Sequence, residues 1–434
     1  MSVIRVIGAG LAGCEAAYAL AEAGHDVELY EQKPVKFSPA HKSELFAELV
    51  CSNSFKADRV ESASGLLKEE MRMLGSVTLK AADTCRVPAG GALAVNRDLF
   101  SRAVTDAVRG HERIRVISEE VTDIDPEIPT IIATGPLTEG KLAEKLAELT
   151  GSESLYFYDA AAPIVTRDSL EMSELFSQSR YDRGGDDYLN ASFDRPGYEA
   201  FVEELVNAEC AELHSFDLDQ PVYEGCMPIE KLAKRGKDAI RFGPMKPVGL
   251  VNPATGHRPW AAVQLRKENE EGTMFNLVGF QTNLKFGEQK RVFSMIPGLE
   301  HAEFARYGVM HRNSFLNAPK VLDGTLRIKG MENTYVAGQL TGIEGYMESA
   351  AAGILAARFL NMRLAGREPE PLPEETMLGA MMKYLGTENK DFQPLGAAMG
   401  ILPPLGKTIK DKKERYAAYA SRAIEAMRAY TEDK

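Results

Sequence analysis

Residues 1–13 read MSVIRVIGAGLAG, and an apolar strand predicted over residues 3–7 runs directly into Gly8, Gly10 and Gly13. In dinucleotide-binding turns of this spacing, the first glycine permits the tight turn and the second leaves room for the pyrophosphate. The third glycine lets the following helix lie close to the sheet. The phosphates sit on free N–H groups at the positive end of that helix. We therefore predict that a dinucleotide contacts Gly8, Ala9, Gly10, Leu11, Ala12 and Gly13.

An acidic residue follows this turn at the expected distance. A helix is predicted over residues 11–23, Gly24 is typical of its C-terminal end, and a second strand over residues 27–30 leads to Glu31. A carboxylate roughly 20 residues beyond the glycines binds the hydroxyl groups of a ribose. Because the carboxylate of Glu31 would repel a 2′-phosphate, FAD or NAD is the expected ligand and NADP the least favoured.

The composition is that of a water-soluble protein with more than one domain. With 434 residues, the chain is expected to form two domains, at about 100 to 200 residues per domain. No apolar run reaches the roughly 18 residues that a membrane span requires, and the first strand leaves no room for a signal peptide. The cysteines lack the paired spacing of a disulfide framework or a zinc site; they are Cys14, Cys51, Cys85, Cys210 and Cys226. We expect a cytoplasmic protein without a membrane partner or a bound metal.

The net charge of −12 argues against nucleic acid as a partner only if the charge is evenly spread. It is not, because basic residues cluster between residues 226 and 246 and again between residues 407 and 415. The first cluster includes Lys231, Lys234, Arg235 and Lys237. Taken alone, such clusters are most often solvated faces.

Strands and helices alternate through the first third of the chain, a pattern typical of a parallel sheet. Helices are predicted over residues 64–74 and 97–108, and strands over residues 114–117 and 130–135, the last ending at Gly135. From about residue 176 to residue 304 the chain is richer in aromatic residues, proline and glycine, with short strands over residues 260–265 and 275–280. This stretch predicts an inserted domain.

After the insertion, the nucleotide-binding pattern resumes. A strand over residues 333–338 ends at Gly338, and a helix rich in small residues is predicted over residues 342–357, beginning at Gly342. Together with Gly135, these segments resemble the later nucleotide-contacting motifs of glutathione-reductase-like flavoproteins. Gln339 stands where those proteins carry an aspartate that contacts the ribityl chain. A second GxGxxG motif is absent, so a nicotinamide cofactor is expected to bind only transiently.

We therefore predict an α/β protein. Its FAD-binding Rossmann-like domain, of the glutathione-reductase type, comprises residues 1–175 and 305–434, and a smaller inserted α+β domain comprises residues 176–304. The apolar spacing over residues 416–430 predicts an amphipathic terminal helix that packs on the core.

Two cysteines are candidates for chemistry. Cys226 precedes a helix predicted to start at Pro228 and run to Gly236, where the positive helix end and nearby basic side chains would favour a nucleophilic thiolate. Cys51 opens a loop of small polar residues after an apolar run, where a bound cofactor could reach it. The alternative for either cysteine is that it is only a small buried apolar side chain.

Seven segments resemble the TrmFO family of bacterial folate- and FAD-dependent tRNA uridine-C5 methyltransferases, and the resemblance covers essentially the whole chain. They are GAGLAG at 8–13, FAELVCSNS at 46–54, RVPAGGALAV at 86–95, EGCMPIE at 224–230, FGPMKPVG at 242–249, VGFQT at 278–282 and RYGVMHRN at 306–313.

The resemblance implies formation of ribothymidine in the T-loop of tRNA. Methylenetetrahydrofolate would give the carbon, FAD the hydride, and NADH or NADPH would reduce the flavin. By the same resemblance, Cys226 attacks uracil C6, and Cys51 either removes the C5 proton or holds a flavin-bound carbon. His311 and its neighbour Arg312 are assigned to the folate, and the basic cluster around Cys226 to tRNA phosphates.

Other functions are compatible with the same residues. The same chemistry on a ribosomal RNA uridine is the nearest, followed by a wobble-uridine modifier of tRNA. A flavin-dependent oxidoreductase of small molecules and an RNA-binding flavoprotein without catalysis belong to other classes.

Overall fold

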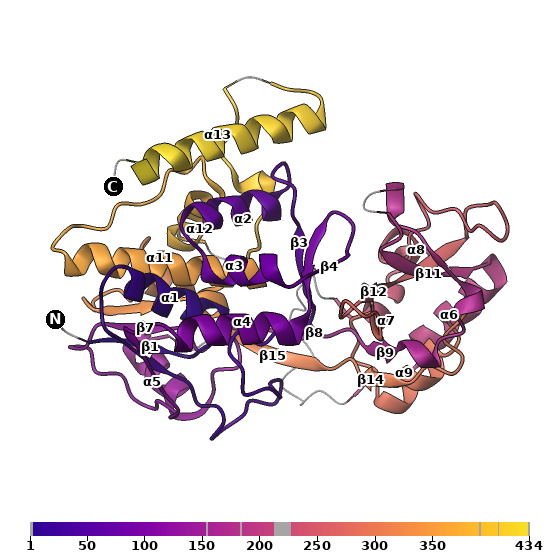
Figure 1. Ribbon diagram of the computed structural model, residues 1–434, viewed down its shortest axis with the longest axis horizontal. Helices are drawn as coiled ribbons and strands as arrows, with labels where there is room; N and C mark the ends of the chain where they lie inside the picture. Colours follow the sequence, from indigo (N-terminus) through magenta and orange to yellow (C-terminus); the bar gives the residue numbers. More distant parts are fainter. Residues whose placement is uncertain are drawn as a thin grey trace.

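The computed structural model describes residues 3–152, 155–182, 185–211, 227–389, 392–406 and 408–432. These residues form two lobes, each with its own sheet and its own cluster of buried apolar side chains (Figure 1).

The larger lobe is built on a parallel five-stranded sheet in the order β16-β7-β1-β2-β6. Its strands are β1 (Ile4–Ile7), β2 (Val27–Tyr30), β6 (Ile114–Ile117), β7 (Thr130–Ile132) and β16 (Thr334–Val336). Each of these strands was predicted, although β7 and β16 end before the glycines assigned to them. The parallel sheet confirms the predicted α/β class.

Helices pack around this sheet, and those over residues 11–22, 63–73 and 97–109 were predicted to within one residue at each end. The helices around the sheet are α1 (Leu11–Glu22), α2 (Ala63–Met73), α3 (Val77–Thr84), α4 (Arg97–Arg109), α5 (Gly140–Thr150), α10 (Ala318–Val321), α11 (Tyr346–Leu364) and α12 (Met377–Gly386).

The prediction of a helix starting at Gly342 was wrong. The helix α11 begins at Tyr346, after a short 3₁₀ turn over Gly338–Thr341. Gly342 and Gly345 have φ angles of +84° and +126°, which a helix cannot contain. The small residues that suggested an earlier start instead form the turn that leads into the helix.

The smaller lobe contains a six-stranded sheet in the order β10-β11-β12-β13-β9-β14, with antiparallel neighbours. Its strands are β9 (Ile164–Thr166), β10 (Leu175–Ser177), β11 (Tyr188–Phe193), β12 (Ala261–Lys267), β13 (Met274–Leu277) and β14 (Phe304–Arg306). The helices of this lobe are α6 (Arg195–Asn207), α7 (Ile229–Ala233), α8 (Ala239–Phe242) and α9 (Phe286–Phe293). The sheet thus also takes in β9, which precedes residue 176, and the domain limits given above stay a prediction.

Two small sheets lie between these parts. One pairs β8 (Leu155–Ala160) with β15 (Met310–Phe315). The other combines β3 (Ser54–Ala57), β5 (Ala92–Val95) and β4 (Arg86–Val87). Because β8 and β15 precede and follow the strands of the smaller lobe, the chain leaves and re-enters the larger lobe through one paired ribbon (Figure 1).

The C-terminal helix α13 (Lys412–Glu432) packs over α2 and buries one side against the larger core, as predicted (Figure 1). Its buried residues are Ala420, Ala423, Met427 and Tyr430. No helix within the described ranges is both long enough and apolar enough to cross a membrane.

Candidate functional site

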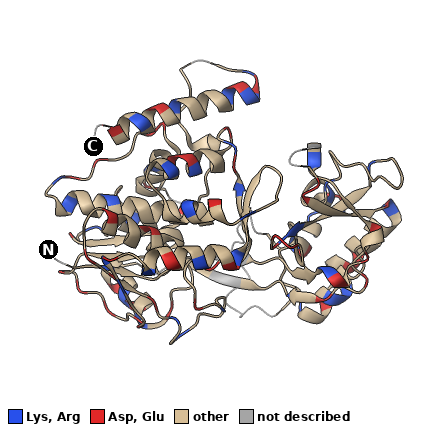
Figure 2. Ribbon diagram, viewed as in Figure 1, with Lys and Arg blue, Asp and Glu red and all other residues tan. Residues whose placement is uncertain are grey.

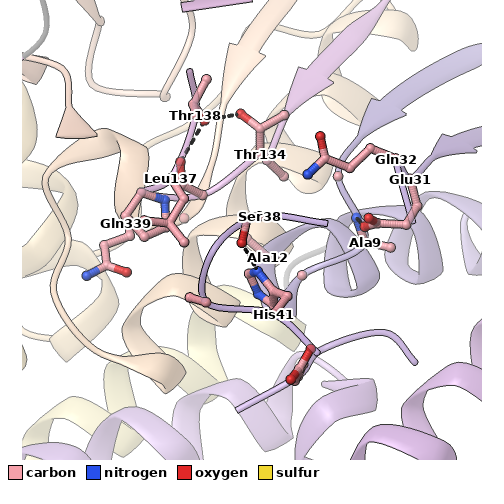
Figure 3. Close-up of a pocket in the computed structure, with 18 of the residues that line it drawn as sticks. Ala9, Ala12, Glu31, Gln32, Ser38, His41, Thr134, Leu137, Thr138 and Gln339 are labelled. Atoms are coloured by element: carbon pink, nitrogen blue, oxygen red, sulfur yellow. Dashed lines mark hydrogen bonds between the residues drawn. The ribbon is translucent and has the colours of Figure 1, made fainter. Parts of the chain in front are cut away.

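A pocket lies at the carboxyl ends of the parallel strands, where ligands of open α/β sheets bind. Figure 3 shows this pocket, whose walls come from the glycine turn, from the end of β2 and from the segments after β7 and β16. The predicted residues that line it are Gly8, Ala9, Gly10, Leu11, Ala12, Glu31, Cys51, Gly135 and Gly338.

The three glycines of the turn differ in what surrounds the position of a missing Cβ. Gly8 has a φ of +98°, and a Cβ there would lie 2.6 Å from the carbonyl oxygen of Ala133. A Cβ on Gly13 would lie 1.7 Å from the carbonyl oxygen of Gly8, so this residue lets α1 pack on the strand and does not line the pocket. A Cβ on Gly10 would meet nothing within 4 Å. The space above Gly10 is therefore open to a ligand.

Glu31 lies beside Ala9 at the pocket wall (Figure 3). Its carboxylate accepts the backbone N–H of Ala9 at 2.8 Å and that of Lys33 at 3.0 Å. A carboxylate has about four lone-pair sites, so about two acceptor positions are left for a ligand. The two bonds hold the side chain in place relative to the glycine turn.

The opposite wall is formed by the segments after β7 and β16. Gly135 has a φ of +77° and no atom within 4 Å of its Cβ position, and the hydroxyl groups of Thr134 and Thr138 are hydrogen-bonded beside it (Figure 3). Gln339 also lines the pocket, and its amide donates to the carboxylate of Glu344. Gly342 lies away from the pocket lining, since a Cβ there would meet the ring of Phe392 at 2.6 Å.

Cys51 reaches the same pocket from the loop before β3, where it contacts Tyr346. The Sγ of Cys51 lies 3.1 Å from the hydroxyl oxygen of Tyr346. The same oxygen accepts the backbone N–H of Cys51 at 2.7 Å and that of Ser52 at 3.2 Å. Tyr346 is the first residue of α11, so the N-terminus of this helix lies beside Cys51.

Buried charges surround the loop that carries Cys51. Arg97 on α4 forms an ion pair with Glu268 at 2.6 Å and donates to the carbonyl oxygen of Leu49 at 2.6 Å. Arg306 on β14 donates to the carbonyl oxygen of Val50. Burial and the neighbouring Arg97 lower the pKa of Arg306. Both guanidinium groups interact electrostatically with Glu268 and with Cys51.

The loop is also held by the smaller lobe. Arg266 on β12 donates to the side-chain oxygens of Asn53 and Ser52, both at 2.9 Å. The amide of Asn53 in turn donates to the carbonyl oxygens of Val95 and Lys267, one in each lobe. The segment from Leu49 to Asn53 is thus a point at which the two lobes contact each other.

Cys226 lies outside the residues that the structure describes. The helix after it, α7, starts at Ile229 and ends at Ala233, so it is shorter than predicted, and Pro228 occupies the position before its first turn. Glu230 is buried and accepts from the Thr282 hydroxyl and the Asn283 N–H. It is a structural residue of the smaller lobe.

The basic residues predicted for RNA lie on and after α7. Lys231 is partly buried, whereas Lys234, Arg235 and Lys237 are exposed. Lys and Arg in this lobe are interspersed with Asp and Glu (Figure 2). The two residues predicted to contact the folate, His311 and Arg312, lie on β15. In the register of the two strands they stand opposite Asp159 and Tyr158 of β8. Asn313, the next residue of β15, lines the pocket.

Sequence reasoning missed Tyr346, Arg97 and Arg306. The first lay inside a helix predicted to begin earlier, and the two arginines carry no motif of their own. Arg306 does open the segment RYGVMHRN, which was the available signal. Among the described residues, no group of His, Cys, Asp or Glu is arranged to hold a metal ion, and Cys14, Cys85 and Cys210 are free thiols.

Known proteins share both the sequence and the fold. The family model described as "Glucose inhibited division protein A" matches residues 3–368. A methylenetetrahydrofolate–tRNA-(uracil-5-)-methyltransferase TrmFO from Acetivibrio thermocellus is 54% identical over 428 residues, with 98% of each chain covered. The protein of that name from Halalkalibacterium halodurans is 53% identical with the same coverage. GidA of Aquifex aeolicus, in one crystal form, has a TM-score of 0.69 at 16% identity, covering 99% of this chain and 73% of its own, a likeness of fold alone.

The fold and the pocket define a protein of the GidA class, with a Rossmann-type domain for FAD. Within that class, the chain belongs to the TrmFO family of methylenetetrahydrofolate–tRNA-(uracil-5-)-methyltransferases and is a methyltransferase of that kind.

Proposed function

We propose that this protein methylates C5 of the T-loop uridine of tRNA, with the carbon taken from methylenetetrahydrofolate. The observation that supports this most directly is that Cys51 and the dinucleotide turn line one pocket. A thiol that lines the same pocket as the glycine turn supports a role for Cys51 in transferring a one-carbon unit beside a bound flavin. NADH or NADPH would be a transient reductant, and the cytoplasm the compartment.

The pocket fits FAD. The open space above Gly10 would admit the pyrophosphate, and the helix α1 begins directly after it, with no side chain bonded to its cap. Glu31 would hold the ribose hydroxyl groups, while Gly135 and Gly338 would let the chain approach the other half of the cofactor. When bound, FAD would supply the reducing electrons that turn the transferred carbon into a methyl group.

The chain itself must activate uracil, because C5 of uracil is a poor nucleophile. We assign this task to Cys226, whose thiolate would form a bond to C6 and push the electron pair of the C5–C6 bond toward C5. After C5 has gained its carbon, the C5 proton must leave, and the bond between C6 and the sulfur of Cys226 would break as a hydride reaches the new carbon, which restores the C5–C6 double bond and releases the thiolate. Cys51 would take that proton, or it would hold the incoming carbon before transfer, and His311 and Arg312 would contact the folate.

We assign the exposed side chains of Lys234, Arg235 and Lys237, with Lys231 beside them, to tRNA phosphates. They follow Cys226 in the sequence, so phosphate contacts there would place the RNA near the nucleophile. In this proposal the smaller domain, residues 176–304, carries the RNA-facing cysteine, and residues 1–175 and 305–434 carry the cofactor.

The decisive experiment measures methylation of an unmodified T-arm RNA by mass spectrometry. The holoprotein receives methylenetetrahydrofolate and NADH in one reaction and S-adenosylmethionine in another. We expect one added methyl group on the T-loop uridine in the folate reaction only.

Cysteine variants identify the nucleophile in the same assay. Cys226→Ala should abolish methylation, whereas Cys210→Ala, a second cysteine of the smaller lobe, should retain it. Methylation that survives in Cys226→Ala would contradict the assignment of the nucleophile. A folded, flavin-bound protein that methylates ribosomal RNA but not the T-arm would contradict the substrate.

A further inference from the structure

The hydroxyl group of Tyr346 has three neighbours, and their chemistry fixes where its proton points. The backbone N–H groups of Cys51 and Ser52 can only donate, at 2.7 and 3.2 Å, so they occupy the two lone pairs of the phenolic oxygen. The remaining contact is the Sγ of Cys51 at 3.1 Å. Since both lone pairs are taken, the O–H of Tyr346 is the donor in that contact and the sulfur is the acceptor.

We propose that Tyr346 is a positioning residue for Cys51, which holds the main chain of residues 51 and 52 and donates its O–H to the sulfur, so that the thiolate is favoured. The inference rests on the proposed role of Cys51 in methylation. Both roles considered for that cysteine, base and carbon acceptor, require a lone pair on the sulfur. Tyr346 would serve either role without contacting the uracil.

The surroundings of the pair are consistent with a thiolate. Within the part of the chain that the structure describes, Arg97 on α4 and Arg306 on β14 interact electrostatically with Cys51, and Glu268 after β12 interacts with both arginines. Arg266 on β12 donates to the side chain of the neighbouring Ser52. The positive charges of Arg97 and Arg306 favour a negative sulfur. Burial and the nearby Cys51 raise the pKa of Tyr346 well above its usual value, so the phenol keeps the proton that it donates.

The test is the pH dependence of Cys51 alkylation in the FAD-loaded protein. Iodoacetamide is added over a range of pH, and the modified Cys51 peptide is quantified by mass spectrometry, so that the other cysteines do not contribute. In Tyr346→Phe the midpoint of the profile should move up by about one pH unit, as expected for loss of a hydrogen bond to a charged group. An unchanged midpoint in a variant that still binds FAD would overturn the proposal.

Tyr335→Phe is the matched control. Tyr335 lies on β16, is buried, and its hydroxyl has no hydrogen-bond partner among the residues described. Its loss should leave the Cys51 profile unchanged, and an equal shift in this control would show that the effect is not specific to Tyr346.

A second variant covers the case in which Tyr346→Phe loses FAD. A fluorinated tyrosine introduced at position 346 keeps the ring and the oxygen but makes the O–H a stronger donor. The midpoint should then move to lower pH, and no movement would overturn the proposal. These profiles do not depend on RNA, so they separate this proposal from the proposed methylation.

Discussion

Gly10 and Gly13 lie three residues apart, yet the space left by the missing side chain is used differently at each position. The missing side chain of Gly13 makes way for the protein itself, because a Cβ would overlap the carbonyl oxygen of Gly8 at 1.7 Å. The missing side chain of Gly10 makes way for something outside the protein, since its Cβ position is open. A pair of alanine substitutions therefore separates folding from cofactor binding.

We expect Gly13→Ala to destabilise the protein by about 1–3 kcal/mol or more, as overpacking does. Gly10→Ala should leave the melting temperature of the flavin-free protein nearly unchanged and weaken FAD binding by about tenfold or more, roughly 1.4 kcal/mol. Thermal unfolding and the flavin absorbance of the purified variants check both statements. Equal losses of stability in the two variants would contradict this division of roles.

At the scale of single elements, the N-terminus of α12 is held by a residue from another helix. Glu70 on α2 accepts the N–H groups of Met377 and Leu378, at 2.7 and 2.8 Å. These are two of the N–H groups that a helix cannot satisfy internally. Burial nevertheless raises the pKa of Glu70 to about 8. The carboxyl group thus joins α2 to α12, while its burial favours the protonated form.

The raised pKa of Glu70 makes stability depend on pH. Between the usual glutamate value of about 4.3 and a folded-state value of about 8, the folded protein binds more protons than the unfolded chain, so stability falls as pH rises through this window. Relative to Glu70→Gln, the wild type should lose about 1 kcal/mol or more between pH 5 and pH 8. Chemical denaturation of both proteins at several pH values measures this difference, and parallel pH profiles would refute it.

At the scale of the whole molecule, an acidic protein must bind a polyanion through a local surface. The net charge is −12, while Lys234, Arg235 and Lys237 are exposed on the smaller lobe. Each phosphate contact releases counterions, so each adds to the salt dependence of binding. The salt dependence therefore reports the local surface and not the net charge.

We expect Lys234→Ala to reduce the slope of log affinity against log salt by about one unit in a tRNA-binding titration. Lys141→Ala, an exposed lysine on α5 of the larger lobe, removes the same charge at a distance and should leave the slope unchanged. If both variants behave alike, the RNA contacts are not where we assign them.

The parts that could be predicted from the sequence are those encoded by neighbouring residues. The glycine turn, α1, β2 and Glu31 follow one another within about thirty residues, and local sterics determine them. The contact between Cys51 and Tyr346 joins residues 295 positions apart, and no local pattern specifies it. The start of α11 was misplaced for a related reason, because small residues suit both a helix and a turn with positive φ, and the packing of Gly342 against Phe392 decides between them.

The close packing of α1 on α11 has a kinetic consequence. A Cβ on Gly353 would lie 2.1 Å from the carbonyl oxygen of Ala12, so α1, which follows the glycine turn, and α11, which carries Tyr346, are in contact through their backbones. Walls joined in this way cannot separate without breaking the core. This part of the pocket is therefore formed before FAD binds. The observed rate of FAD binding should then rise in proportion to the FAD concentration, without a plateau.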